Sequence, residues 1–501
     1  MQVAFEKNTL ACLQRAAWEV KNEEYTQEVK VPDNMPDIGN VLGAWGQPVL
    51  RSKTWHGNGM TAAGGILVWI LYIPENETSP RMIESWLPYQ FRWDFSQTQQ
   101  DGTILIRTLL QAMDVRTLTP RKLMLRGVIC AAGEALIPDM LETWEPTELP
   151  NDVHVLRQRY PVTLPTEAAE KVFSIDETFP LSASCENADK VMYYSLKPEI
   201  TDQKIMGDKL VFRGVVKVMG MCRSDEQKLE PVFLEIPFSQ YAQLQREYAE
   251  DAEVMLLPEI SNAELELSEA GTLHITGDVV GQYVIYDHPV LELIEDVYSP
   301  SRTVTPQWQA LEMPAILEHR QNVLRAEGNM ETDSEEILDG IMCIAHPALQ
   351  RQGPNVRLEQ PFCFRALWST LEGSFRGAET SGSLQLDLEA DSKTRLLAWS
   401  HPSAVVQRNS TPGHLQLRGE ITVHTVTISE QPHSMITALE LGQMIEPDPD
   451  RPSLILRRVG KDSLWQIAKK CGSTVEAICE ANGLTGEPEQ GRILLIPMAH
   501  I

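Results

Sequence analysis

One pattern of strands and glycines occurs twice at the same spacing, and it constrains the fold of this 501-residue chain more than any other feature. A strand-like run around Gly64 is followed by a polar turn, a Pro-aromatic segment and a second run around Gly127. The same order recurs around Gly214 and Gly277, and each pair of glycines lies 63 residues apart. Equal spacing in weakly similar sequence indicates a duplicated structural unit.

A third copy of the pattern is looser. Gly340, the Pro361-Phe362 pair and Gly419 follow one another in the same order, but these two glycines lie 79 residues apart. Two interpretations stay open: the third copy carries an insertion, or one of its anchors is misplaced.

The residues inside the repeats have the pattern of strands. Segments such as 265–267 (Leu-Glu-Leu) and 384–388 alternate apolar and polar residues, so one face is buried and the other meets water. Glycine within such a strand predicts a bulge or a close approach of the backbone. Each unit is therefore predicted to be an antiparallel sandwich or open barrel of roughly 100–130 residues.

We predict a mainly β chain of three tandem antiparallel β-sandwich or open-barrel domains followed by a small βααβ module. The predicted ranges are 1–145, 165–300 and 315–440 for the β domains, 441–452 for an acidic Pro-rich linker and 453–501 for the terminal module.

Proline-rich segments separate the predicted domains. The segments 138–150, 161–165 and 299–314 are predicted to be stiff linkers that hold the domains apart. Residues 8–21 carry apolar side chains at helical spacing, which predicts either a short amphipathic helix or a part of the first domain.

Charge and composition limit the possible partners and location. The chain has 43 Lys and Arg against 70 Asp and Glu, a formal charge of −27. Such a surface repels nucleic acid and anionic lipid, although acidity can also serve solubility alone. The first residues lack the basic start and apolar run of a secretory signal, and no apolar run is long enough for a membrane span. We therefore expect a cytoplasmic protein.

The eight cysteines contain no Cys-x-x-Cys pair, and most lie in apolar surroundings, as free thiols do in a reducing compartment. Cys471 and Cys479 share the terminal module, so a disulfide or a metal role stays open for them, but no His stands at a ligand spacing. No metal and no cofactor are predicted.

The terminal module reads as strand, helix, helix, strand over 454–497. Asp462 or Ser463 can cap the first helix by accepting its free N–H groups. Asn482-Gly483 has the form of a left-handed cap at the end of the second helix.

This module resembles the LysM domain. The resemblance rests on Val459, Asp462, Ser463, Leu464, Ile467, Ala468, Asn482, Gly491, Leu494, Ile496 and Pro497, with Lys461 interrupting the usual Gly-Asp step. LysM domains hold N-acetylglucosamine polymers such as peptidoglycan or chitin in a shallow groove between two loops that flank the helices. The resemblance implies a groove, for glycan or protein, made by Asp462, Ser463, Leu464, Asn482, Gly483 and Leu484. A purely structural role is the alternative, in which Asp462 caps, Leu464 packs and Asn482 turns the chain.

The repeats resemble the SPOCS domain of spore-coat and spore-morphogenesis proteins in Firmicutes. The segment 31–38 (Val-Pro-Asp-Asn-Met-Pro-Asp-Ile) is similar to the opening of that domain, and Pro88, Pro237 and the downstream glycine strands fit it. The second and third copies lack a clear opening. Several such repeats before one LysM are similar to proteins of the SipL type. The resemblance implies a mother-cell protein at the forespore surface or spore coat, whose LysM contacts a coat-basement ATPase of the SpoIVA type.

Motifs for catalysis are absent from the sequence. There is no phosphate-binding Gly-x-x-x-x-Gly-Lys-Ser/Thr loop, dinucleotide fingerprint, His-Glu-x-x-His motif or Gly-x-Ser-x-Gly elbow. The sequence predicts a non-enzymatic structural and interaction protein of spore-envelope assembly, with no catalytic residues. The alternative is a peptidoglycan-binding cell-wall protein, which requires export. A hydrolase is a third class, for which no residues can be named.

Overall fold

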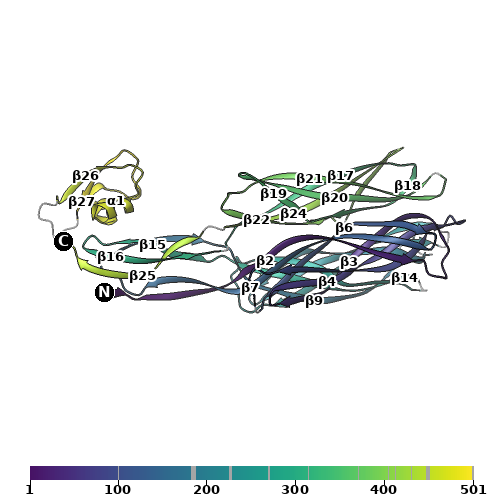
Figure 1. Ribbon diagram of the computed structural model, residues 1–501, viewed down its shortest axis with the longest axis horizontal. Helices are drawn as coiled ribbons and strands as arrows, with labels where there is room; N and C mark the ends of the chain where they lie inside the picture. Colours follow the sequence, from purple (N-terminus) through teal and green to yellow (C-terminus); the bar gives the residue numbers. More distant parts are fainter. Residues whose placement is uncertain are drawn as a thin grey trace.

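The computed structural model describes residues 1–498 except 100, 182–184, 186–187, 225–227, 269–270, 314, 371, 404, 412, 430–431 and 447–451. Three β units form an elongated body, a narrower β stalk extends from one end of it, and a small α/β module lies beside the stalk (Figure 1). This confirms the predicted mainly β class with a helical C-terminal module.

The first two units share one topology of two three-stranded antiparallel sheets, ordered β2–β7–β6 with β3–β4–β5 and β9–β14–β13 with β10–β11–β12. The first unit consists of β2 (Phe5–Lys30), β3 (Ile38–His56), β4 (Gly59–Pro74), β5 (Arg81–Asp94), β6 (Thr103–Thr119) and β7 (Lys122–Pro146). The second consists of β9 (Leu164–Pro180), β10 (Ala188–Met206), β11 (Lys209–Ser224), β12 (Leu229–Gln243), β13 (Glu253–Leu267) and β14 (Thr272–Asp287). Strands β3, β4, β6 and β7 each begin 150 residues before their counterparts, which accounts for the repeated glycine spacing.

The first glycine of each copy, Gly64 or Gly214, has the same structural reason in both units. Gly64 pairs with Tyr89 and Gly214 pairs with Phe238 on the neighbouring strand. A Cβ at Gly64 would lie 2.8 Å from the Tyr89 ring, and one at Gly214 would lie 2.5 Å from Phe238. The strand on the other side is bulged at the matching places, between Leu50 and Ser52 and between Ile200 and Asp202. Both predicted causes, a bulge and a close approach, therefore occur together.

The third unit repeats the order with two of its strands broken. It consists of β17 (Ile316–Glu331), β18 (Ser334–Ile344), β19 (Ala348–Gln352), β20 (Asn355–Thr370), β21 (Phe375–Glu389), β22 (Thr394–Pro402), β23 (Gln407–Thr411) and β24 (His414–Ser429). Strands β18 and β19 both pair with β20, whose other neighbour is β21, while β22 and β23 both pair with β24, whose other neighbour is β17.

Two anchors of the third copy were placed a strand too early. Gly340 lies on β18, the counterpart of β3, whereas Gly64 and Gly214 lie on β4 and β11. Pro361 likewise lies on β20, the counterpart of β4. The contact between glycine and aromatic ring is still present with its members exchanged, because Phe362 pairs with Gly382 and its ring would lie 2.6 Å from a Cβ there. The longer spacing therefore reflects a misplaced anchor.

The stalk is built partly from segments predicted to be linkers and partly from the ends of the predicted β domains. It contains β1 (Gln2–Val3), β8 (His154–Pro161), β15 (Val290–Tyr298), β16 (Arg302–Leu311) and β25 (His433–Met444), in the sheets β1–β25–β16 and β15–β8. The outer end of the antiparallel pair β2–β7 continues into it (Figure 1). The prediction of stiff linkers at 138–150, 161–165 and 299–314 was wrong for most of these residues. Residues 138–146 pair with β2, 161 with β15, 164–165 with β14 and 302–311 with β25. Residues 447–451 of the predicted acidic linker lie outside the described residues.

The amphipathic helix considered for residues 8–21 was wrong, and the alternative holds. These residues belong to β2, which pairs with β7 from Phe5 to Lys30 with one bulge after Arg15. Pairing with so long a partner strand satisfies the backbone groups of β2 that face β7, and this outweighs a helical spacing of a few apolar residues.

The three β units are packed together rather than held apart. One apolar cluster joins Trp45 and Trp69 of the first unit, Phe212 and Tyr194 of the second, and Leu367 of the third. Trp45 stacks on Tyr193 at 4.7 Å, across the boundary between the first two units.

Candidate functional site

The C-terminal module is a closed βααβ unit. It consists of β26 (Leu454–Arg458), α1 (Leu464–Cys471), α2 (Val475–Asn482) and β27 (Ile493–Pro497), and the two strands pair antiparallel. Its core is formed by Val459, Leu464, Ile467, Ala468, Ile478, Leu494 and Ile496. Ser463 caps α1 in a capping box with Gln466, and Gly472 ends α1 in the left-handed conformation. Ser463, rather than Asp462, is therefore the cap.

Two loops of the module are held against each other by a carboxylate. The main-chain N–H of Leu464, at the first turn of α1, donates to Glu487 from the loop after α2, at N–O distances of 2.9 and 3.2 Å. Helix α1 has no acidic residue in its own first turn, so Glu487 supplies the negative charge that a helix N-terminus favours. The loops before α1 and after α2 are thus tied together.

The six predicted groove residues lie in these two loops or at their edges, and each also has a structural contact. Asp462 forms ion pairs with Arg457 at 2.6 Å and Lys470 at 2.8 Å, and the hydrogen bond from Lys470 helps to lower the pKa of Asp462. Leu464 is buried in the core. Asn482 is fastened to β27, because its side chain donates to the Leu495 carbonyl at 2.6 Å and accepts from the Leu495 N–H at 2.8 Å.

The remaining two predicted residues shape the second loop. Gly483 has φ 61° and caps α2, and Leu484 packs against the module core. The structure therefore brings the six residues to the two tied loops, while their role in binding stays a prediction.

A contact between the module and the stalk was not predicted. Tyr298 at the end of β15 belongs to the module core and donates to the Ser473 carbonyl at 3.0 Å. The same Tyr298 ring meets Trp465 edge-on at 4.8 Å. Asp296 accepts from the Trp465 indole at 2.8 Å and pairs with Lys469 at 2.5 Å. Trp465 and Lys469 lie one turn apart on α1, so a single helix face is fixed to β15.

This contact fixes the ionisation of Asp296. Burial alone would raise the pKa of Asp296, but the hydrogen bonds from Lys469 and Trp465 hold it below its ordinary value. Trp465, Lys469 and Ser473 make the polar contacts with the stalk. Among the described residues, no hydrogen bond or ion pair joins any of the six groove residues to the stalk. The polar contacts that anchor the module to the stalk are therefore made by residues other than the six of the groove.

Comparison with known families agrees with this geometry. The LysM domain family matches residues 461–497. These residues form a LysM domain. Comparisons of the whole chain with curated proteins and with solved structures gave no significant match. LysM is a binding domain, and its presence supports recognition of a glycan that contains N-acetylglucosamine.

Metal, disulfide and membrane features were also sought in the described part of the chain. It contains no cluster of three or more His, Cys, Asp or Glu side chains suited to a metal ion. No disulfide joins Cys471 and Cys479 beside the LysM core. No described helix has the length and apolar character needed to cross a membrane.

Proposed function

We propose that this chain is a binding protein for N-acetylglucosamine polymers of the peptidoglycan type, and that the groove of its LysM domain holds the glycan. The support is the LysM domain itself, together with an anchor on β15 whose hydrogen bonds and ion pair do not involve the two groove loops among the described residues. The stalk and the three-unit body form a large non-catalytic support for that groove.

Glu487 offers a specific test of this proposal. Because its carboxylate ties the two groove loops together, Glu487→Ala is expected to weaken glycan binding roughly tenfold, which corresponds to about 1.4 kcal/mol for a lost charge-assisted bond at a helix N-terminus. Glu487→Gln keeps a neutral acceptor and is expected to lose less. The measurement is retention of the full chain on purified peptidoglycan at graded protein concentration.

The matched control is Glu489→Ala, which removes the same charge from an exposed position in the same loop. That variant is expected to bind like the unaltered chain. Equal binding by the two alanine variants would show that the tied loops do not form the glycan site.

Assembly of a spore envelope is the second candidate function. It is supported by the resemblance of the repeats and by three copies of one β unit, which offer similar surfaces to a protein scaffold. In that role the partner is a coat-basement ATPase of the SpoIVA type, and the location is the mother cell at the forespore surface. The same retention assay separates the two roles: capture by the immobilised ATPase without retention on peptidoglycan would favour the assembly role.

A further inference from the structure

Two cysteines stand directly opposite each other in the third unit. Cys343 lies on β18 and Cys363 on β20, and they are register partners in this antiparallel pair. Side chains at such partner positions point to the same face of the sheet. Their Cα atoms lie about 4.5 or 5.5 Å apart, depending on the hydrogen-bond pattern, and a disulfide joins Cα atoms about 4.4–6.8 Å apart. The backbone therefore already has the spacing that a disulfide between them needs.

Both thiols lie on the face of the sheet that turns toward the first unit. Their chain neighbours Met342 and Phe364 are buried in the core of the third unit, so the cysteines lie on the opposite face. Arg365, two residues after Cys363, shares that face and donates to main-chain carbonyls of the first unit. The cysteine pair is therefore part of the junction between the units.

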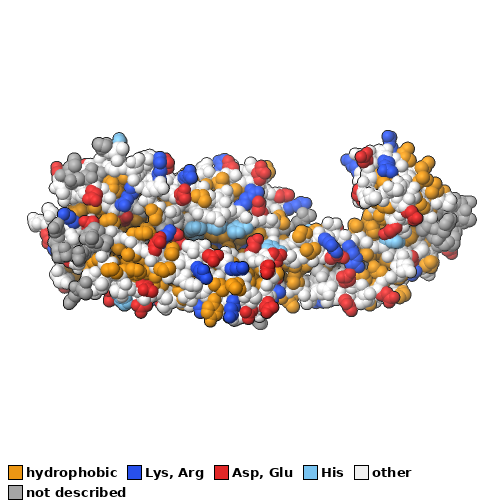
Figure 2. Space-filling model, turned by 180° about the vertical axis from the view of Figure 1, so that it is seen from behind, with side chains coloured by type: hydrophobic (Ala, Val, Ile, Leu, Met, Phe, Trp, Pro, Cys, Tyr) orange, Lys and Arg blue, Asp and Glu red, His pale blue; other side chains and the backbone are white. Residues whose placement is uncertain are grey.

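A cavity lies where the three units meet, and one of the two thiols lines it. The cavity measures about 1210 Å³, and Cys343 lines it together with His319, His401 and His424. Figure 2 shows histidine side chains along a seam in the middle of the body. Both cysteines are partly exposed. Ligand pockets in proteins commonly measure about 300–1000 Å³, so a small reagent has room beside Cys343.

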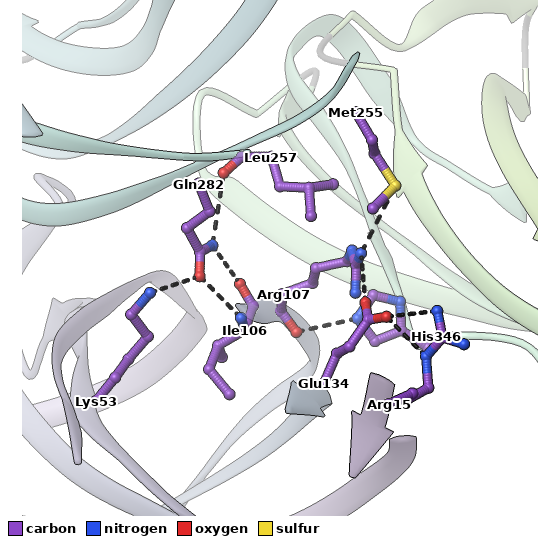
Figure 3. Close-up of polar contacts among 9 residues, drawn as sticks. All are labelled: Arg15, Lys53, Ile106, Arg107, Glu134, Met255, Leu257, Gln282 and His346. Carbon is purple, nitrogen blue, oxygen red and sulfur yellow. Dashed lines mark hydrogen bonds and ion pairs between the residues drawn. The ribbon is translucent and has the colours of Figure 1, made fainter. Parts of the chain in front are cut away.

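The end of β18 is attached both to its own sheet and to the first unit. Its pairing with β20 ends at Ile344, after two bulges, and no other described strand pairs with it. Two residues further on, His346 contacts the first unit, because its Nε2 lies 3.1 Å from the Arg107 carbonyl (Figure 3). A link between Cys343 and Cys363 would add a covalent bond at the point where the pairing of β18 with β20 ends.

The surroundings favour Cys343 as the thiol that reacts first. Burial raises the pKa of both thiols, that of Cys363 to about 12. Arg365 and Lys197 act against the rise in pKa at Cys343, whereas the neighbouring Cys343 thiol adds to the rise in pKa at Cys363. Only a thiolate attacks a disulfide, so oxidation is expected to be slow at pH 7 and faster at pH 9.

We propose that Cys343 and Cys363 are an oxidisable pair, which a small-molecule disulfide converts into a cross-strand disulfide that links the end of β18 to β20. The Cys343 thiolate attacks one sulfur of the reagent and releases the other half of the reagent as a thiol. The Cys363 thiolate then attacks the Cys343 sulfur and releases the second half. Two protein S–H bonds and the reagent S–S bond are broken, and one protein S–S bond and two reagent S–H bonds form. This site is separate from the LysM groove and does not depend on the proposed function.

Peptide mapping of the full chain after incubation with excess 2-hydroxyethyl disulfide at pH 8.5 tests the proposal. The chain is then acidified, unfolded, alkylated to block the remaining thiols and cut with trypsin without reduction. Trypsin cuts after Arg325, Arg351, Arg357 and Arg365, so the disulfide appears as peptide 326–351 joined to peptide 358–365. This joined peptide is expected in most molecules. Recovery of both cysteines as thiols, or with half of the reagent on each, would overturn the proposal.

Two alanine variants test whether the link depends on the cross-strand position. Cys343→Ala is expected to abolish the joined peptide, and circular dichroism checks its folding. Cys12→Ala removes a buried cysteine of β2 that has Asp139 opposite it, and it is expected to leave the joined peptide unchanged. In the unaltered chain, peptide 358–365 joined to a cysteine other than Cys343 would contradict the proposed pair.

Hydrogen–deuterium exchange of the oxidised and reduced chains tests the effect of the link. Exchange along residues 334–344 is expected to be roughly tenfold slower in the oxidised chain, because the disulfide keeps the end of β18 from opening. The same treatment of Cys343→Ala is expected to leave exchange along β18 unchanged. Equal exchange along β18 in the oxidised and reduced forms of the unaltered chain would refute the link between the strands.

Discussion

Replacing Glu134 by alanine is expected to lower the free energy of unfolding by about 3–5 kcal/mol, the usual cost of removing one partner from a buried ion pair. Glu134 is only 2% exposed and is the carboxylate that Arg15 and Arg107 share. Without it, two guanidinium groups stand together at the junction of the three units, and Arg107 cannot reach water to recover its hydration. The measurement is equilibrium unfolding in urea.

A control on the same strand separates this effect from the loss of any carboxylate. Glu142 lies on β7 too, where it pairs with Lys7 at 2.5 Å with both side chains partly exposed. Glu142→Ala is expected to cost less than about 1 kcal/mol, as surface pairs do. Similar costs for the two variants would mean that the buried junction contributes little to holding the units together.

Acid is expected to weaken the body through His346, by about 1.4 kcal/mol for each pH unit from 6.5 down toward pH 3. His346 is 3% exposed, and burial lowers its pKa to about 3. Its Nδ1 accepts the Ser400 N–H at 3.3 Å, and its Nε2 lies 3.1 Å from the Arg107 carbonyl. A proton on Nδ1 would face the Ser400 N–H, so two hydrogen-bond donors would point at each other. The unfolded chain therefore takes up this proton first, and stability present above pH 6.5 is lost as the pH falls.

The contribution of His346 is isolated by comparing variants, because other groups titrate in the same range. His346→Asn retains an acceptor and a donor without a titrating ring. Between pH 6.5 and pH 4.5 it is expected to lose about 2–3 kcal/mol less stability than the unaltered chain, measured by urea unfolding at each pH. His274→Asn, at a partly exposed position beside Asp176, is the control for the histidine-to-asparagine change itself. Parallel pH profiles for the His346 variant and the unaltered chain would refute a neutral buried histidine.

The repeated units could be predicted from the sequence because their main constraint is local. An aromatic ring above a glycine on the next strand fixes both residues at a given spacing, as at Gly64 and Gly214. In the third copy the aromatic residue, Phe362, comes first in the chain and the glycine, Gly382, lies on the next strand. A search for glycine followed by an aromatic residue therefore assigns the third copy to the wrong strand.

The stalk could not be predicted, because it is made by pairs distant in the chain. Val290 pairs with Pro161, and Leu441 pairs with Val304. Prolines in these segments indicate linkers when the sequence is considered alone, yet an edge strand tolerates a missing N–H. Strands β8 and β16 are both edges of their sheets.

The candidate sites also contain some features set by neighbouring residues and others set by residues distant in the chain. Caps such as Ser463 and Gly483 follow from neighbouring residues and could be predicted. Glu487 and Asp296 act across loops or between parts of the molecule, so no local pattern marks them. Arg107 did leave a signal, as a charged residue inside the apolar run 104–110 of β6, but its partners come from all three units.

Hydrogen–deuterium exchange of the full chain with and without an N-acetylglucosamine hexamer tests the central claim most directly. Binding in the LysM groove while the domain stays on the stalk predicts slower exchange in the loops 460–464 and 483–488, with unchanged exchange at Tyr298 and along β15. Unchanged exchange in both loops at saturating hexamer, or protection confined to the body, would contradict a glycan-binding groove anchored on the stalk.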